Sequence, residues 1–92
     1  MSLLLKVRVC QSRDVVSHSF KGTVYVADPS RGSVRILNKT ASAIWNAVKQ
    51  PVYIREIVEL VEEEFNVSKP EATRDVSNFV KKYLRLKLFR KS

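Results

Sequence analysis

Side chains that perform chemistry in enzymes are few in this sequence. His18 and Cys10 are its single histidine and single cysteine, so the Cys/His cluster that a zinc site needs is absent. His18 shares one face of a predicted strand with Val16 and Phe20 and has no obvious nucleophile beside it, which favours a structural role. No glycine-rich loop is present to hold a phosphate group. The sequence therefore predicts a protein that is not an enzyme and that has no metal and no cofactor.

Charge is unevenly distributed along the chain. Seventeen Lys and Arg against nine Asp and Glu give a net charge of +8, which favours an acidic partner such as nucleic acid, an anionic surface or an acidic peptide. Residues 56–64 hold five glutamates on the face of a predicted helix opposite its apolar stripe, so a solvated surface is favoured over a metal site. Residues 81–91 hold six bases and no acid: Lys81, Lys82, Arg85, Lys87, Arg90 and Lys91.

The length of the chain allows one hydrophobic core. Residues 1–92 are therefore expected to form a single domain, and the 45% content of hydrophobic residues favours a folded chain. The N-terminal run MSLLLK is too short for a signal peptide or a membrane-spanning helix. Cys10 has no partner for an internal disulfide, which is typical of a reducing compartment. A cytoplasmic protein without membrane association is expected.

The first third of the chain has the two-residue periodicity of β-strands. Apolar and polar residues alternate in Val15–Phe20 and Ser33–Leu37, and Thr23–Ala27 is rich in β-branched and aromatic residues. These segments predict an antiparallel meander. Leu5–Val9 also alternates and predicts a fourth strand within residues 1–12. It is expected to pair with Val15–Phe20 or with the same segment of a second chain, which would give a monomer or a strand-mediated homodimer.

The rest of the chain has the 3.6-residue periodicity of helices. The side chain of Asn38 is a good N-cap for a first helix, which Pro51 ends. A second helix is predicted over residues 54–65, and a third begins after the capping box at Ser68. A three- or four-stranded antiparallel sheet followed by three helices is therefore expected. Helical spacing predicts a core made of Ala41, Ile44, Trp45, Ile57, Val58, Val61, Phe65, Val76, Phe79 and Tyr83.

A set of short motifs follows the predicted meander. Residues 37–41 have the pattern L-N-x-T-A and are followed by I-W at residues 44–45. Further along the chain come Glu56-Ile57-Val58, Glu63-Glu64-Phe65, Asp75-Val76, Phe79-Val80 and Tyr83-Leu84. In the order and spacing of these motifs the chain, from Arg13 to Phe89, resembles the PqqD family, also called the RiPP recognition elements.

Three positions depart from the family pattern. Lys49-Gln50-Pro51 stands where Asp-Gly is common after the first helix. Tyr53 replaces the Thr that commonly caps the second helix, and Lys87 replaces a Gly near the end of the third. These departures affect helix ends and loop shape, not the order of the elements.

The resemblance implies an α+β, winged-helix-like domain with a non-catalytic role. Such domains hold the leader segment of a ribosomally made precursor peptide and deliver it to a modifying enzyme, often a radical-SAM enzyme or a leader protease. The leader is expected to add a strand beside Ser33–Leu37, in a groove closed by the third helix. The peptide-binding residues expected are Ser33, Val34, Arg35, Ile36, Leu37, Thr73, Ser77, Val80, Lys81 and Leu84. The opposite flank of that helix, Asp75, Phe79, Lys82 and Leu86, is the alternative wall.

Two other functions fit parts of the sequence. A nucleic-acid-binding winged helix would explain the basic end of the third helix. The acidic second helix argues against it, because that helix would cross the phosphate backbone. A general adaptor that recognises a folded protein is also compatible with the sequence. The basic end of the third helix, with Lys81 and Lys82, is expected either to attract an acidic leader or to be a solvated surface.

Overall fold

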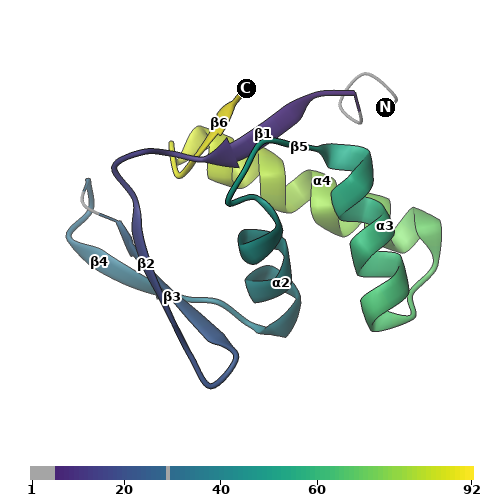
Figure 1. The fold of residues 1–92 in the computed structure, drawn as a ribbon, viewed down its shortest axis with the longest axis horizontal. Helices are drawn as coiled ribbons and strands as arrows, with labels where there is room; N and C mark the ends of the chain where they lie inside the picture. Colours follow the sequence, from purple (N-terminus) through teal and green to yellow (C-terminus); the bar gives the residue numbers. More distant parts are fainter. Residues whose placement is uncertain (1–5, 29) are drawn as a thin grey trace.

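The computed structural model describes residues 6–28 and 30–92 of the chain. Within these residues it is an α+β fold with three helices, as the sequence predicts, but with two small antiparallel sheets where the sequence predicts one (Figure 1). The elements, in chain order, are β1 (Arg8–Gln11), β2 (Val16–Phe20), β3 (Thr23–Asp28), β4 (Ser33–Ile36), α2 (Lys39–Ala47), β5 (Val52–Tyr53), α3 (Ile54–Phe65), α4 (Lys69–Arg85) and β6 (Phe89–Lys91).

The predicted meander is the sheet β2-β3-β4. Its first turn contains Lys21 and Gly22, both with positive φ, at 52° and 82°. Two residues of this kind match the twist of a tight hairpin. Along β3, inward residues such as Val24 and Val26 are buried and alternate with half-buried ones. The alternation of the sequence therefore identifies the face of this sheet that packs on the helices.

The second sheet corrects the expected pairing of the N-terminal strand. β1 lies between β5 and β6, with Val9 opposite both Val52 and Lys91, and it does not pair with β2. Leu5 lies outside the described residues. The alternating pattern indicates a strand but carries no information about its partners. Val52 and Lys91, the partners of Val9, follow it in the chain by 43 and 82 positions. Both edges of β1 are occupied within the chain, so this strand has no free edge for a second copy.

Two departures from the family pattern are accommodated locally. The backbone N–H of Tyr53 donates to Glu56 Oε1 at 2.9 Å, so the glutamate caps the start of α3 although Tyr53 is a poor cap itself. Lys87 has φ of 64°, the left-handed conformation that glycine adopts most easily. The turn after α4 is thereby kept, and it leads into β6, a strand that the sequence patterns did not predict.

The helix caps follow the sequence. Asn38 Oδ1 accepts the backbone N–H of Ala41 at 2.8 Å, and Ser68 Oγ accepts that of Glu71 at 3.3 Å. Asn66 ends α3 in the left-handed conformation. These caps satisfy backbone groups that the helix ends leave unpaired.

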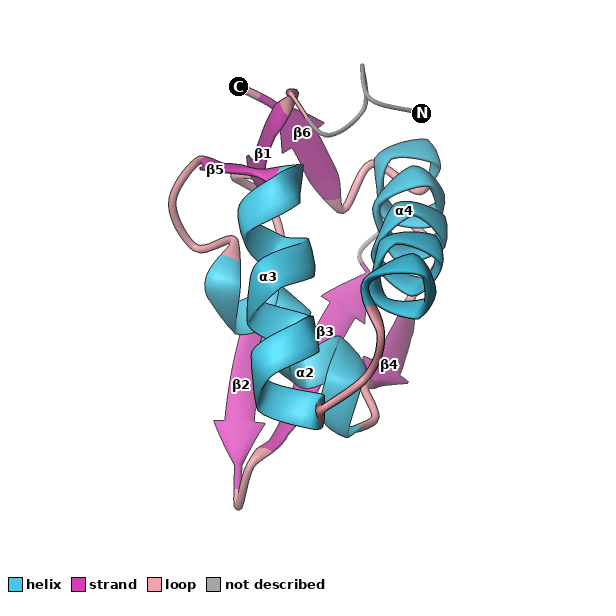
Figure 2. Ribbon diagram, turned by 90° about the vertical axis from the view of Figure 1, so that its right-hand side faces the viewer, coloured by secondary structure: helices cyan, strands magenta, loops and turns pink. Residues whose placement is uncertain are grey.

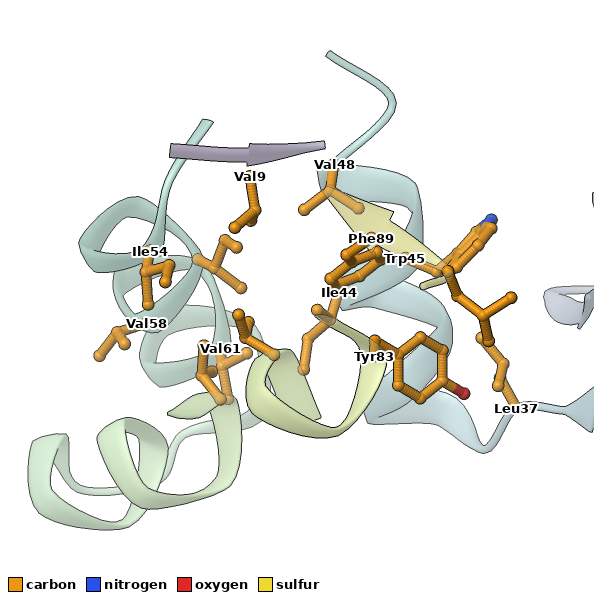
Figure 3. Close-up of a cluster of buried hydrophobic side chains, with 14 of the residues drawn as sticks. Val9, Leu37, Ile44, Trp45, Val48, Ile54, Val58, Val61, Tyr83 and Phe89 are labelled. Carbon is orange, nitrogen blue, oxygen red and sulfur yellow. The ribbon is translucent and has the colours of Figure 1, made fainter. Parts of the chain in front are cut away.

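The core lies between the three helices and the inner faces of both sheets. Trp45 is fully buried, stacks on Phe89 with ring centroids 5.5 Å apart and meets Tyr83 edge-on at 6.1 Å (Figure 3). Its Nε1–H donates to Ser17 Oγ at 3.0 Å. Of the ten predicted core residues, all but Ala41, Phe65 and Phe79 are buried; these three pack against the core while half-buried.

Candidate functional site

The candidate site begins at the free edge of β4. In the described residues, β4 pairs with β3 on one side and has no partner on the other. The backbone N–H of Leu37 donates to the carbonyl oxygen of Val24 at 2.9 Å, so it points toward β3. Because backbone groups alternate in direction along an antiparallel strand, the N–H and C=O groups of Val34 and Ile36 point away from β3. The edge therefore offers two donors and two acceptors for an added strand.

The side chains of β4 alternate in the same way. Arg35 lies opposite the buried Val26 and faces inward, with 27% of its side chain exposed. Val34 and Ile36 face outward and are 62% and 69% exposed. An added strand would therefore meet one inward cation and two outward apolar side chains.

A groove of about 580 Å³ runs between this edge and α4. Figure 2 shows β4 and α4 on the same side of the molecule. One wall is the segment from Ser33 to Asn38 with Ala41, and α4 contributes Phe79, Lys82 and Tyr83. A smaller hollow of about 250 Å³ shares Asn38, Ala41 and Phe79 with the groove and adds Asp75.

On α4 the groove is lined by Phe79 and Lys82 of the alternative flank, whereas Asp75 and Leu86 of that flank lie in neighbouring hollows. Thr73, Ser77, Val80 and Leu84 do not line the groove. Val80 is fully buried in the core, and Leu84 packs against the core while half-buried. The buried stripe of α4 thus lies closer to Val80 than the sequence suggested, which turns Phe79 and Lys82 toward β4.

Among the basic residues of α4, Lys82 lines the groove and Lys81 does not. Lys81 is exposed and lines neither the groove nor the hollows beside Asn38 and Arg85. Tyr83, Asn38 and Ala41 line the groove but were not expected there. Tyr83 could have been found, because it is four residues from Phe79 and shares its side of the helix.

A buried carboxylate supports the inner side of β4. Asp28 is 1% exposed; its Oδ2 lies 3.2 Å from Nη1 of Arg31 and 3.9 Å from Nε of Arg35. Among the described residues, neither Asp28 Oδ1 nor Arg35 Nε has a hydrogen-bond partner. Asp28 therefore does not fully satisfy the hydrogen-bonding capacity of Arg35.

Tyr83 forms the floor beside this pair. The Arg35 guanidinium carbon lies 5.9 Å from the centre of the Tyr83 ring. Burial raises the pKa of the Tyr83 hydroxyl above its ordinary value, and the nearby positive charge of Arg35 partly opposes that shift. The hydroxyl is therefore neutral at pH 7.

Other kinds of site are not seen in the part of the chain that the structure describes. Residues 6–28 and 30–92 contain no group of three His, Cys, Asp or Glu side chains arranged to hold a metal ion. No helix among them is long and apolar enough to cross a membrane. His18 lies opposite Tyr25 on the outer face of the meander, and Cys10 is buried.

Comparison with known proteins finds a similar solved structure and a matching family. The solved structure of TbiB1 in complex with the TbiA(beta) leader peptide superposes with a TM-score of 0.80, at 25% sequence identity, over 88% of this chain and 94% of that one. A search of curated proteins finds no match. Residues 24–88, well over half of the chain, match the family of coenzyme PQQ synthesis protein D. The chain belongs to the PqqD family.

Proposed function

We propose that this protein binds the leader segment of a ribosomally made precursor peptide as an additional strand on β4. The observation that carries the proposal is the unpaired edge of β4, which opens onto the groove beside α4. Support comes from the family and from the shared fold with TbiB1, which was solved with a leader peptide. Residues 1–92 would act together as one peptide-binding domain.

Strand addition suits a disordered leader. The peptide gains main-chain hydrogen bonds from the backbone groups of Val34 and Ile36, and the groove side chains select its sequence. The protein performs no chemical step in this proposal. It presents the peptide to a modifying enzyme, such as a radical-SAM enzyme or a leader protease. The placement of His18 on the outer face, away from Arg35 and the groove, is consistent with this passive role.

The test removes a single edge donor. Ile36→Pro deletes an N–H that points away from β3, whereas Arg35→Pro would break a bond within the meander. Ser19→Pro is the matched control: by the same alternation, its N–H points to the free edge of β2 on the other side of the sheet.

Binding is measured by fluorescence polarisation with the labelled leader of a precursor encoded beside this gene. Circular dichroism first checks that both proline variants are folded. We expect Ile36→Pro to weaken binding at least tenfold and Ser19→Pro to change it less than twofold. Equal affinity for the parent and for folded Ile36→Pro would show that the peptide does not add to β4.

A further inference from the structure

The charged side chains that line the main part of the groove are all positive. Arg35 from β4 and Lys82 from α4 line it, and no Asp or Glu lies among the residues of its main part. The neighbouring hollow of about 340 Å³ adds Arg31, Arg85 and Lys87, again without an acid. Asp75 is at the opposite end, in the hollow beside Asn38. Asp14 and the buried Asp28 line a further hollow that shares Ser30, Leu86 and Lys87 with the hollow beside Arg85. The bases outnumber these two acids, so the end of the groove where β4 begins is net positive, and an acid lies beside the other end.

Arg35 is a groove cation whose guanidinium does not have all its hydrogen-bond donors satisfied within residues 6–28 and 30–92. Its only carboxylate neighbour, among the described residues, is Asp28 at 3.9 Å, which lies closer to Arg31. Its Nε has no hydrogen-bond partner in that part of the chain. A second carboxylate stabilises such a half-buried guanidinium more than it stabilises an exposed lysine, because water screens the charge of the guanidinium less.

We infer that the groove selects a peptide with a carboxylate side chain placed between Arg35 and Lys82. This inference rests on the proposed function and names the chemistry that the groove recognises. Side chains that are paired across an added strand point to the same face, so the acid stands opposite Arg35 on the inner face. The residues on either side of it point outward and lie beside Val34 and Ile36, which favour apolar neighbours. The peptide motif is an acid flanked by apolar residues.

The test uses a random 12-residue peptide library displayed on messenger RNA and selected on the full chain. We expect enriched peptides to contain Asp or Glu between two apolar residues. Changing that acid to its amide in a synthetic peptide should weaken binding roughly tenfold, equivalent to about 1.4 kcal/mol, since the amide keeps a hydrogen bond but loses the charge.

Lys82→Glu reverses the charge of a residue that lines the groove, and Lys81→Glu is its control. Both lysines are exposed on α4, but only Lys82 lines the groove, so neither change disturbs the core. Lys82→Glu should weaken binding of the acidic peptide. A selection repeated on this variant should enrich peptides with Lys or Arg in place of the acid. Lys81→Glu should keep the parental preference. A structural effect of Lys82 would not produce this exchange of sign.

The outcomes separate the two proposals. If the enriched peptides bind the Ile36→Pro variant poorly but show no preference for an acid, the inference is overturned while strand addition is supported. Failure to enrich any peptide that depends on Ile36 would count against both. Binding of a duplex oligonucleotide that Lys82→Glu abolishes, without an acidic peptide motif, would assign these cations to nucleic acid instead.

Discussion

Replacing Trp45 by alanine tests whether the packing of α2 holds this small domain together. The Trp45 side chain is fully buried, with 0% solvent exposure, and it contacts Phe89 and Tyr83. Burying about 150–250 Å² of such a ring at about 25 cal/mol per Å² contributes roughly 4–6 kcal/mol. Residual burial in the unfolded chain lowers this figure. We therefore expect a loss of about 3–5 kcal/mol.

That loss is large against the total stability of the domain. A chain of this length has a free energy of unfolding of about 5–14 kcal/mol. Each kcal/mol shifts the melting temperature by roughly 4–8 °C in a domain of this size, so Trp45→Ala should lower it by well over 10 °C in calorimetry or be largely unfolded.

Two controls separate the ring from its hydrogen bond. Trp45→Phe keeps most of the apolar contact, and Ser17→Ala removes only the acceptor of the indole N–H; the second change should cost about 1 kcal/mol. A melting temperature of Trp45→Ala within about 5 °C of the parent would refute the packing described for α2.

Three further changes test other parts of the fold. Val9 is fully buried in the central strand of the second sheet, so Val9→Ala should cost about 2 kcal/mol in urea unfolding; no loss would contradict the pairing of β1. Asp28→Asn leaves Arg35 with a weaker partner and should cost about 1–2 kcal/mol in the same assay; an unchanged midpoint would mean that this carboxylate does not support β4. Because the pKa of Tyr83 is raised in the folded state, its titration changes nothing below pH 10 and lowers stability as the pH rises above 10. The parent should therefore lose more stability than Tyr83→Phe between pH 10 and 11, and parallel curves would show that this hydroxyl is not shielded from water.

The order and type of most elements could be predicted because they depend on local periodicity. Alternation in Ser33–Leu37 places Val34 and Ile36 on one face, and helical spacing places Trp45 in the core; both are confirmed. The cap at Asn38 is equally local, since its side chain bonds a backbone group three residues away. The motifs between residues 37 and 84 gave the family for the same reason: they record which residues must be small, apolar or capping at fixed spacing.

Only the tertiary structure decided which elements meet. β1 pairs with β5 and β6 because long-range packing, which no local pattern encodes, brings residues 52 and 89–91 beside it. The rotation of α4 about its axis had the same origin: its apolar arc is wide, and either flank was compatible with the spacing. Packing against α3 and the sheets buries Val80 and leaves Phe79 and Lys82 facing β4. The sequence determined the strand that forms one wall of the groove, and the packing of α4 determined the other wall.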